Sequence, residues 1–199
     1  MEMIKVFIEI ESCDFDTCLD LVNTGEWTGV MVEPSPPYFK NLEKLVKASP
    51  YGNNVHLENT AISDYMGKID FTVAKDMTCE EGNDVNGWVR GISSVSATNH
   101  KGERMLDKPA NQKFIDYHTT VPCMTLNALI SKYKYEHVNY LKIDTEGHEL
   151  NILEAYDWDI KPDLIKIEHT HVDDIFVANL LKQHGYLVYT EQHDLYAIR

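Results

Sequence analysis

Short apolar runs alternate with helical patterns along most of this chain, and this alternation limits the possible folds more than any other feature. Residues 29–33 form the apolar run GVMVE, and apolar side chains then recur at helical spacing from Tyr38 to Val46. Strands that are apolar throughout are typical of a parallel sheet covered by helices on both faces. We therefore predict an α/β fold with a doubly wound sheet. The seven predicted strands are residues 6–10, 29–33, 55–57, 138–143, 164–167, 186–190 and 195–198.

The end of the chain differs from this pattern. The strands predicted at 186–190 and 195–198 follow each other closely, so we expect them to form an antiparallel edge of a mostly parallel sheet. Between the third and fourth strands, residues 69–73 and 119–121 are predicted to be extended segments that flank a less regular region. Apolar residues from Val172 to Leu180, including Ile175 and Phe176, predict a helix before the closing strands.

Composition excludes several classes of protein. The chain has 199 residues, 43% of them hydrophobic, and we expect a single domain over residues 1–199. Its formal net charge is -14, whereas non-specific binding of nucleic acid requires clustered Lys and Arg. We therefore expect a small-molecule or glycan substrate and no nucleic acid. No stretch approaches the roughly 20 apolar residues of a spanning helix, so no membrane partner is predicted. The sequence does not indicate an oligomeric state.

Cysteine usage and the start of the sequence indicate the compartment. Cys13, Cys18, Cys79 and Cys123 show neither CxxC spacing nor the density of a disulfide scaffold. The first apolar run is too short for the hydrophobic region of an export signal. We therefore expect a cytoplasmic protein with reduced thiols.

Residues 76–113 are polar, contain four glycines and have no sustained apolar period. A structureless stretch of this length inside a compact domain is uncommon and usually serves as a lid or a disordered loop. We expect a mobile loop that covers a site.

Ligands of doubly wound folds bind beyond the carboxyl ends of the strands, so the residues after each strand are the candidates. Glu33 ends the second predicted strand, where its carboxylate can accept hydrogen bonds from the two ribose hydroxyls of a nucleoside; a turn or helix cap is the alternative. Residues 12–17, SCDFDT, follow the first strand, where backbone N–H groups at a helix start can hold a carboxylate. Asp14 and Asp16 suit a helix-capping role equally well.

Carboxylates and imidazoles gather after the strands at 138–143 and 164–167, which are neighbours in this architecture. Such groups can act as the base that accepts a proton from a reacting hydroxyl. A structural role is the alternative, because acidic residues at a helix start favour the helix dipole. The cluster also admits a divalent metal, although its spacing matches no tight ligand motif, and no metal is predicted. Its members are Asp144, Glu146, His148, Glu149, Glu168, His169 and His171.

Residues 138–156, VNYLKIDTEGHELNILEAY, resemble the signature of the FkbM methyltransferases. In that signature a strand ending in K-I-D precedes an acidic residue, E-G, and a helix that opens with E. Other segments resemble the family in the same order and cover almost the whole chain. These segments are Glu33-Pro34, NTAISD at 59–64, GISSV at 91–95, Thr125-Leu126 and the strand ending in I-E at 164–168.

The resemblance implies a Rossmann-like domain that binds S-adenosyl-L-methionine and usually methylates a hydroxyl, often on a sugar. It implies that Glu33 holds the ribose, that residues 59–64 lie along the adenine, and that Asp144 with Glu146 borders the methyl group and the acceptor. The predicted catalytic residues are Asp144, Glu146, His148 and His169. The predicted cofactor-binding residues are Glu9, Ser12, Cys13, Asp14, Phe15, Asp16, Thr17, Glu33, Pro34, Ser35, Thr60, Ala61, Ile62, Asp64, Ser94 and Asp144.

One segment departs from the family pattern. The first loop of the family resembles D-x-G-A-N-x-G, whereas residues 9–15 read EIESCDF, with Glu11 and Phe15 at the glycine places. A side chain there limits close approach of the backbone to a ligand, and a carboxylate repels the carboxylate of the cofactor. We expect another cofactor-binding geometry in this loop; a non-catalytic binding domain on a methyltransferase fold is the alternative.

Overall fold

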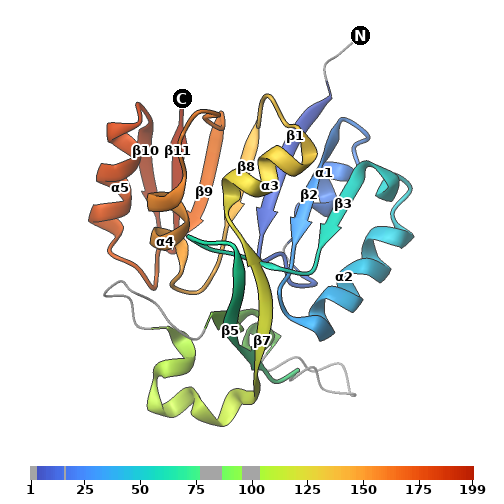
Figure 1. The fold of residues 1–199 in the computed structure, drawn as a ribbon, viewed down its shortest axis with the longest axis vertical. Coiled ribbons are helices and arrows are strands. Elements are labelled where there is room, and N and C mark those ends of the chain that lie inside the picture. Colours follow the sequence, from blue (N-terminus) through green and yellow to red (C-terminus); the bar gives the residue numbers. More distant parts are fainter. Residues whose placement is uncertain (1–3, 16, 77–86, 96–103) are drawn as a thin grey trace.

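The computed structural model describes residues 4–15, 17–76, 87–95 and 104–199. Its larger sheet has seven strands and is mostly parallel, as the sequence predicts (Figure 1). In spatial order the strands are β10 (Leu187–Glu191), β11 (Asp194–Ile198), β9 (Leu164–Glu168), β8 (Tyr140–Ile143), β1 (Lys5–Ile10), β2 (Trp27–Val32) and β3 (Val55–Glu58).

Strand β1 lies near the centre of this sheet and runs parallel to both of its neighbours. Phe7 pairs with Gly29 of β2 on one side and with Tyr140 of β8 on the other. The β2–β3 and β8–β9 pairs are also parallel, so the carboxyl ends of five strands meet at one edge. The predicted antiparallel pairing occurs at the end of the sheet, where β11 lies between β9 and the edge strand β10 and is antiparallel to both.

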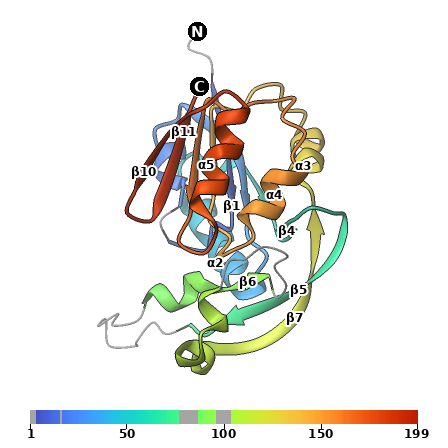
Figure 2. The ribbon, with the colours of Figure 1, turned by 90° about the vertical axis from the view of Figure 1, so that its left-hand side faces the viewer.

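Helices cover both faces of the larger sheet, because successive residues of a strand point to opposite faces. Phe7 and Met31 pack with Val22 of α1 (Leu19–Val22) and Leu42 of α2 (Pro36–Ala48) on one face. Ile8 and its neighbours on the other strands point to the opposite face, toward the remaining helices (Figure 2). Those helices are α3 (Leu126–Tyr133), α4 (Glu149–Ala155) and α5 (Asp174–Gln183).

The predicted helix before the closing strands is confirmed as α5, but its buried stripe differs from the predicted residues. Val177 and Leu181 are buried, whereas Ile175 is 69% and Phe176 45% exposed. This segment contains two apolar stripes at helical spacing, and only one of them can face the sheet. Asp173 is the N-cap of the helix, and its side chain accepts a hydrogen bond from Phe176 N at 3.0 Å.

A second sheet stands beyond the carboxyl edge of the larger one (Figures 1 and 2). The two extended segments predicted at 69–73 and 119–121 belong to its long antiparallel pair, in which Phe71 pairs with Thr119. The hydroxyl of Tyr38 in α2 donates to the carbonyl of Ala74 at 2.9 Å and ties the two parts together. In spatial order the strands of the second sheet are β4 (Ala61–Ile62), β7 (Ile115–Met124), β5 (Gly67–Ala74) and β6 (Ser94–Val95).

The segment predicted as an irregular mobile loop, 76–113, is more regular than expected wherever the structure describes it. It contains the 3-10 helices η2 (Gly87–Ile92), η3 (Met105–Asp107) and η4 (Pro109–Phe114), in addition to β6. Val89 and Leu106 are buried in a small apolar cluster against the second sheet. Sequence periodicity misses such short elements because each spans only one or two turns. Residues 77–86 and 96–103 lie outside the described residues.

Two further expectations concern membranes and thiols. None of the helices in the described ranges is long and apolar enough to cross a membrane. Cys13, Cys18 and Cys123 are buried. Cys79 lies outside the described residues.

One further 3-10 helix, η1 (Gly52–Asn54), precedes β3.

The larger sheet predicts a sharp contrast between two leucines that both lie in its strands. Leu141 in β8 is 1% exposed, whereas Leu187 in β10 is 81% exposed. We expect Leu141→Ala to lower the free energy of unfolding by about 2–5 kcal/mol, because it leaves a cavity in the core. Leu187→Ala is the control and should change it by less than about 0.5 kcal/mol. Urea denaturation measures both, and equal losses would contradict this description of the core.

Candidate active site

A cavity of about 320 Å³ opens at the carboxyl ends of β1, β8 and β9, within the size range of small-molecule sites. We call it the acidic cavity, because carboxylates from all three strand ends line it. Lys142, His171 and His193 are the basic side chains of its lining. The acidic side chains are Glu11, Asp144, Glu146 and Glu168.

The turn between β8 and α4 carries two of these carboxylates. Glu146 and Gly147 both have positive φ angles, 54° and 113°, which bring the chain back sharply before the helix. The buried carboxylate of Glu149, the first residue of α4, accepts hydrogen bonds from Thr145 N at 2.7 Å, Thr145 Oγ1 at 2.8 Å and Gly147 N at 3.0 Å. Glu149 therefore holds the turn in the conformation that presents Glu146 to the cavity.

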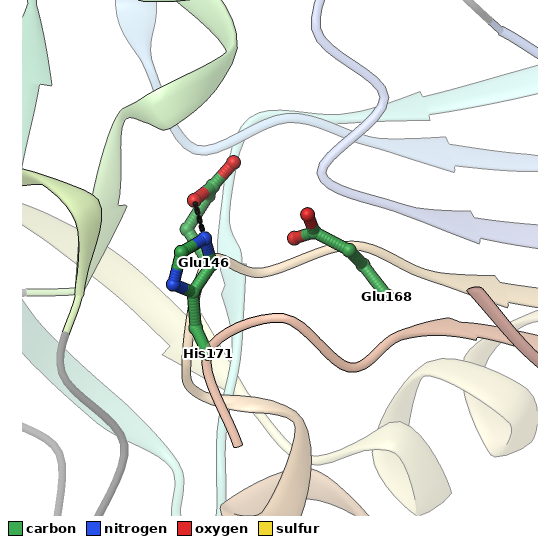
Figure 3. A group of neighbouring side chains, drawn as sticks. All are labelled: Glu146, Glu168 and His171. Carbon is green, nitrogen blue, oxygen red and sulfur yellow. Dashed lines mark ion pairs between the residues drawn. The ribbon is translucent and has the colours of Figure 1, made fainter. Parts of the chain in front are cut away.

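Glu146 faces a histidine that comes from the next strand end. His171 Nε2 lies 3.1 Å from Glu146 Oε2, and both side chains are buried (Figure 3). The carboxylate of Glu168, the last residue of β9, points toward this pair from the other side. The neighbouring positions of β8 and β9 in the sheet bring the three residues together.

The departure from the family pattern at residues 11–17, which we call the first loop, has a structural explanation. Glu11 and Cys13 adopt positive φ angles of 60° and 48°, the left-handed region that glycine occupies at low cost. The loop keeps a backbone suited to glycine while carrying side chains. Oε1 of Glu11 is buried in the cavity wall and has no hydrogen-bond partner among the described residues.

Phe15 stands at the second glycine position of the family pattern, and its side chain finds room in a different way. The ring of Phe15 lies 4.7 Å from the guanidinium carbon of Arg90. A Cβ atom added to Gly91 would lie only 2.8 Å from Phe15 Cζ, so Gly91 makes room for the ring. Asp14 forms an ion pair with Arg90 at 3.5 Å and caps no helix; the residue before α1 is Cys18, which makes no side-chain cap.

Glu33, the predicted ribose ligand, does not line the cavity. Its side chain is buried, and its oxygens accept hydrogen bonds from Cys13 N and Ser35 N, each at 2.7 Å. The carboxylate thus holds the first loop against the end of β2. Pro34 and Ser35 are buried in the same junction.

Glu9 and Lys142 form a buried ion pair between β1 and β8, at 3.3 Å. Both oxygens of Glu9 also accept from Cys18 N, at 3.0 and 3.1 Å, at the start of α1. Glu9 therefore supports the cavity from behind, whereas Lys142 reaches its lining. Thr17 Oγ1 accepts from Leu19 N at 3.2 Å, and Asp16 lies outside the described residues.

The segment predicted to lie along the adenine, residues 59–64, joins the two sheets. Thr60, Ala61 and Ile62 are buried, and Thr60 Oγ1 donates to the Pro122 carbonyl at 3.0 Å. Ser63 Oγ lies 3.0 Å from His148 Nε2 and also bonds Asp64 Oδ1 at 2.9 Å. His148 is therefore held away from the cavity lining, at the start of α4.

The structure brings some of the predicted site residues together and separates others. Ser12, Cys13, Phe15, Asp144 and Glu146 line the acidic cavity, whereas the remaining predicted residues that the structure describes do not. Ser94 is buried in β6, and the backbone N–H of His169 donates to the His193 carbonyl at 2.9 Å.

Lys142 and His193 line the cavity but were not among the candidates of the sequence. Glu168 and His171 also line it; they belonged to the predicted cluster but not to the predicted catalytic residues. An extended chain would direct His169 and His171 to the same side, because side chains two residues apart lie on one face. Residues 170–171 instead form a turn, and of the two histidines only His171 lines the cavity.

The concentration of carboxylates changes their protonation. Burial, together with the nearby charges of Glu146 and Asp144, raises the pKa of Glu168 to about 9. Burial, followed by repulsion from Glu33, raises the pKa of Glu11 well above its usual range. The cavity is therefore short of positive charge, and a cationic occupant is favoured.

Among solved structures, the chain is similar to the precorrin-6y C5,15-methyltransferase of Geobacter metallireducens GS-15, with 12% identity, 100% of this chain and 83% of that chain covered, and a TM-score of 0.50. The fibrillarin/Nop5p complex has 12% identity, coverage of 98% and 71%, and a TM-score of 0.49. M. capricolum TrmK bound to S-adenosyl-homocysteine has 10% identity, coverage of 98% and 60%, and a TM-score of 0.45. No curated protein matches the sequence.

The fold is thus that of the Rossmann-like methyltransferases, as predicted. The profile of the methyltransferase FkbM domain matches residues 8–188. The chain belongs to the FkbM methyltransferase family, which confirms the resemblance in the sequence.

The turn that presents Glu146 depends on Glu149, and this dependence can be tested by substitution. We expect Glu149→Ala to lower the free energy of unfolding by about 2–3 kcal/mol, because buried N–H and O–H donors lose their acceptor. Glu43→Gln, at an exposed position of α2, is the control. Denaturant titration measures both. A Glu149 variant as stable as the control would show that the turn does not need this carboxylate.

The buried Glu33 predicts how stability depends on pH. Burial raises its pKa from 4.5 to about 8, although hydrogen bonds from Ser35 N and Cys13 N oppose the rise. Between these values the folded state keeps a proton that the unfolded state releases, so stability falls as the pH rises through this window. We expect Glu33→Gln to flatten the slope by up to about 1.4 kcal/mol per pH unit.

Unfolding free energies measured from pH 5 to pH 8 test this expectation. Glu43→Gln, on the exposed side of α2, is the matched control and should keep the wild-type slope. A Glu33→Gln slope equal to that of the control would mean that Glu33 is ionised throughout the window.

Proposed function

We propose that this protein is an S-adenosyl-L-methionine-dependent O-methyltransferase whose acceptor is a hydroxyl of a sugar, a glycan or a related small molecule. The observation that supports this proposal most is the acidic cavity at the carboxyl ends of β1, β8 and β9, in a chain of the FkbM methyltransferase family. Cofactors of doubly wound folds bind at this edge of the sheet.

The cavity residues fit the charge of this cofactor. S-adenosyl-L-methionine carries a sulfonium and an ammonium group, and the cavity offers buried carboxyl oxygens that lack hydrogen-bond partners among the described residues, Glu11 Oε1 and Glu168 Oε2. In the proposal Glu11 and the backbone of Ser12 and Cys13 hold the amino-acid end. Asp144 borders the sulfonium.

When bound, S-adenosyl-L-methionine supplies an electrophilic methyl group. In the proposed reaction, the hydroxyl oxygen of the acceptor bonds to the methyl carbon while the carbon–sulfur bond breaks, and Asp144 accepts the hydroxyl proton. Burial raises the pKa of Asp144 above its usual value, which makes it a stronger base than an exposed aspartate. In the proposal, the cavity walls would hold the acceptor in line with the methyl group, as a displacement at carbon requires.

The charge of the cavity also favours some acceptors over others. Its carboxylates repel phosphorylated or carboxylated acceptors, so an uncharged hydroxyl compound is favoured. The net charge of -14 supports a small-molecule or glycan acceptor over nucleic acid. Gly91, Ile92 and Met105, from the segment between β5 and β7, border the cavity and would contact the acceptor.

A specific observation also favours a second candidate, a non-catalytic binding domain. The carboxylate of Glu33 is already engaged with two backbone N–H groups, so a ribose can reach it only if the first loop moves. If the protein does not use this cofactor, Glu33→Ala leaves its biological function unchanged, provided that the variant folds.

Isothermal titration of the purified protein with S-adenosyl-L-methionine and S-adenosyl-homocysteine tests the leading proposal. We expect both to bind, and we expect Glu11→Gln to weaken binding of each about tenfold, because both compounds carry the ammonium group that Glu11 is proposed to hold. Glu43→Gln is the control.

If the protein binds neither compound at millimolar concentration, the leading proposal is refuted. If both bind, intact-mass assays with candidate sugars identify the acceptor.

A further inference from the structure

We propose that Glu146, Glu168 and His171 form a divalent-metal site that holds and activates the acceptor hydroxyl. This role rests on the proposed methyl transfer, whereas the metal site itself stands on the geometry of the three side chains. One ligand atom from each residue lies within 4.8 Å of the other two.

The positions of the three side chains suit one shared ion. Figure 3 shows the carboxylates of Glu146 and Glu168 and the imidazole of His171 around a common space. Two ligands of an octahedral ion with bonds of about 2.1 Å lie about 3 Å apart when adjacent and about 4 Å apart when opposite. In the structure the three ligand atoms lie within 4.8 Å of one another, so ion binding would draw them somewhat closer together.

A buried oxygen without a hydrogen bond provides an independent indication of a ligand. Glu146 is only 8% exposed, and its Oε2 forms an ion pair with His171 Nε2 at 3.1 Å. Oε2 of Glu168 has no hydrogen bond within the described ranges. A buried carboxylate oxygen without a hydrogen bond costs free energy, and a cation at this place would remove that cost for Glu168 while it also binds Glu146.

Two cationic side chains near the cluster have other partners among the described residues. The Arg104 guanidinium donates to the Val95 carbonyl at 2.8 Å and pairs with Asp107. Lys142 is directed to Glu9, at 3.3 Å.

The ligand types indicate which ion binds. Two carboxylates favour Mg²⁺ or Mn²⁺, and an imidazole shifts the preference toward first-row transition metals. We therefore assign Mn²⁺ as the best-fitting ion among these. Three protein ligands leave open positions on the side of the acidic cavity, where two hydroxyl oxygens of a sugar can bind.

The proposed ion would act on the acceptor as a Lewis acid. An oxygen bound to a divalent cation gives up its proton more readily, so the hydroxyl proton passes to Asp144 while the oxygen remains on the metal. The carbon–oxygen bond then forms as the carbon–sulfur bond breaks. Glu146, Glu168 and His171 thus position the acceptor, and Asp144 remains the base.

Titration of the full chain with Mn²⁺, without cofactor, tests the site. Electron paramagnetic resonance measures free Mn²⁺, and we expect one tightly bound ion per chain. Glu146→Gln and His171→Asn should each weaken its binding at least tenfold. His137→Asn and Glu43→Gln are the matched controls, because both residues lie on the surface away from the cavity, and both variants should bind Mn²⁺ as the wild type does.

The outcomes separate this proposal from the proposed function. Wild-type protein that binds no tight Mn²⁺, or folded cavity variants that bind it like the controls, would overturn the metal site even if S-adenosyl-homocysteine binds in the presence of EDTA. A tight Mn²⁺ site in a protein that binds no cofactor would overturn the methyl transfer and leave the site. Thermal unfolding identifies any misfolded variant, and wild-type binding remains decisive if both variants misfold.

Discussion

The parallel pairing of β1, β8 and β9 is the constraint on which the rest of this structure depends. Parallel neighbours end at the same edge of a sheet, so side chains that follow different strands meet there. In this protein those side chains are mostly carboxylates. Glu11, Asp144, Glu146 and Glu168 converge on one cavity, although up to 157 positions separate them in sequence.

Such convergence is costly, and the surrounding structure offsets part of the cost. Glu9 gains the buried ammonium of Lys142, and Glu149 gains three donors from the turn it holds. Glu168 has a raised pKa and lacks an equivalent set of partners. The carboxylates that support the fold thus have donors or cations as partners. Those that line the cavity are less fully paired and attract positive charge, which is the property expected of a site for a cation.

Sequence motifs and spatial roles agree only in part. The segment from Lys142 to Glu149 identifies the family, yet only some of its residues reach the cavity, because His148 bonds Ser63 and Glu149 bonds the turn. Glu33 stands at the predicted strand end but accepts hydrogen bonds from the first loop. A motif shows that a residue belongs to a junction, but the direction of its side chain depends on partners distant in sequence.

The sequence by itself determined the alternation of strands and helices, the parallel sheet and the family, because hydrophobic periodicity and short motifs are local properties. Only the tertiary structure decided which apolar stripe of α5 is buried, how residues 67–74 pair with 115–124, and why Glu11 can stand at a glycine place. It also joined His171 to Glu146 and Glu168. These outcomes depend on contacts between distant segments, whose geometry is fixed only when the whole chain packs.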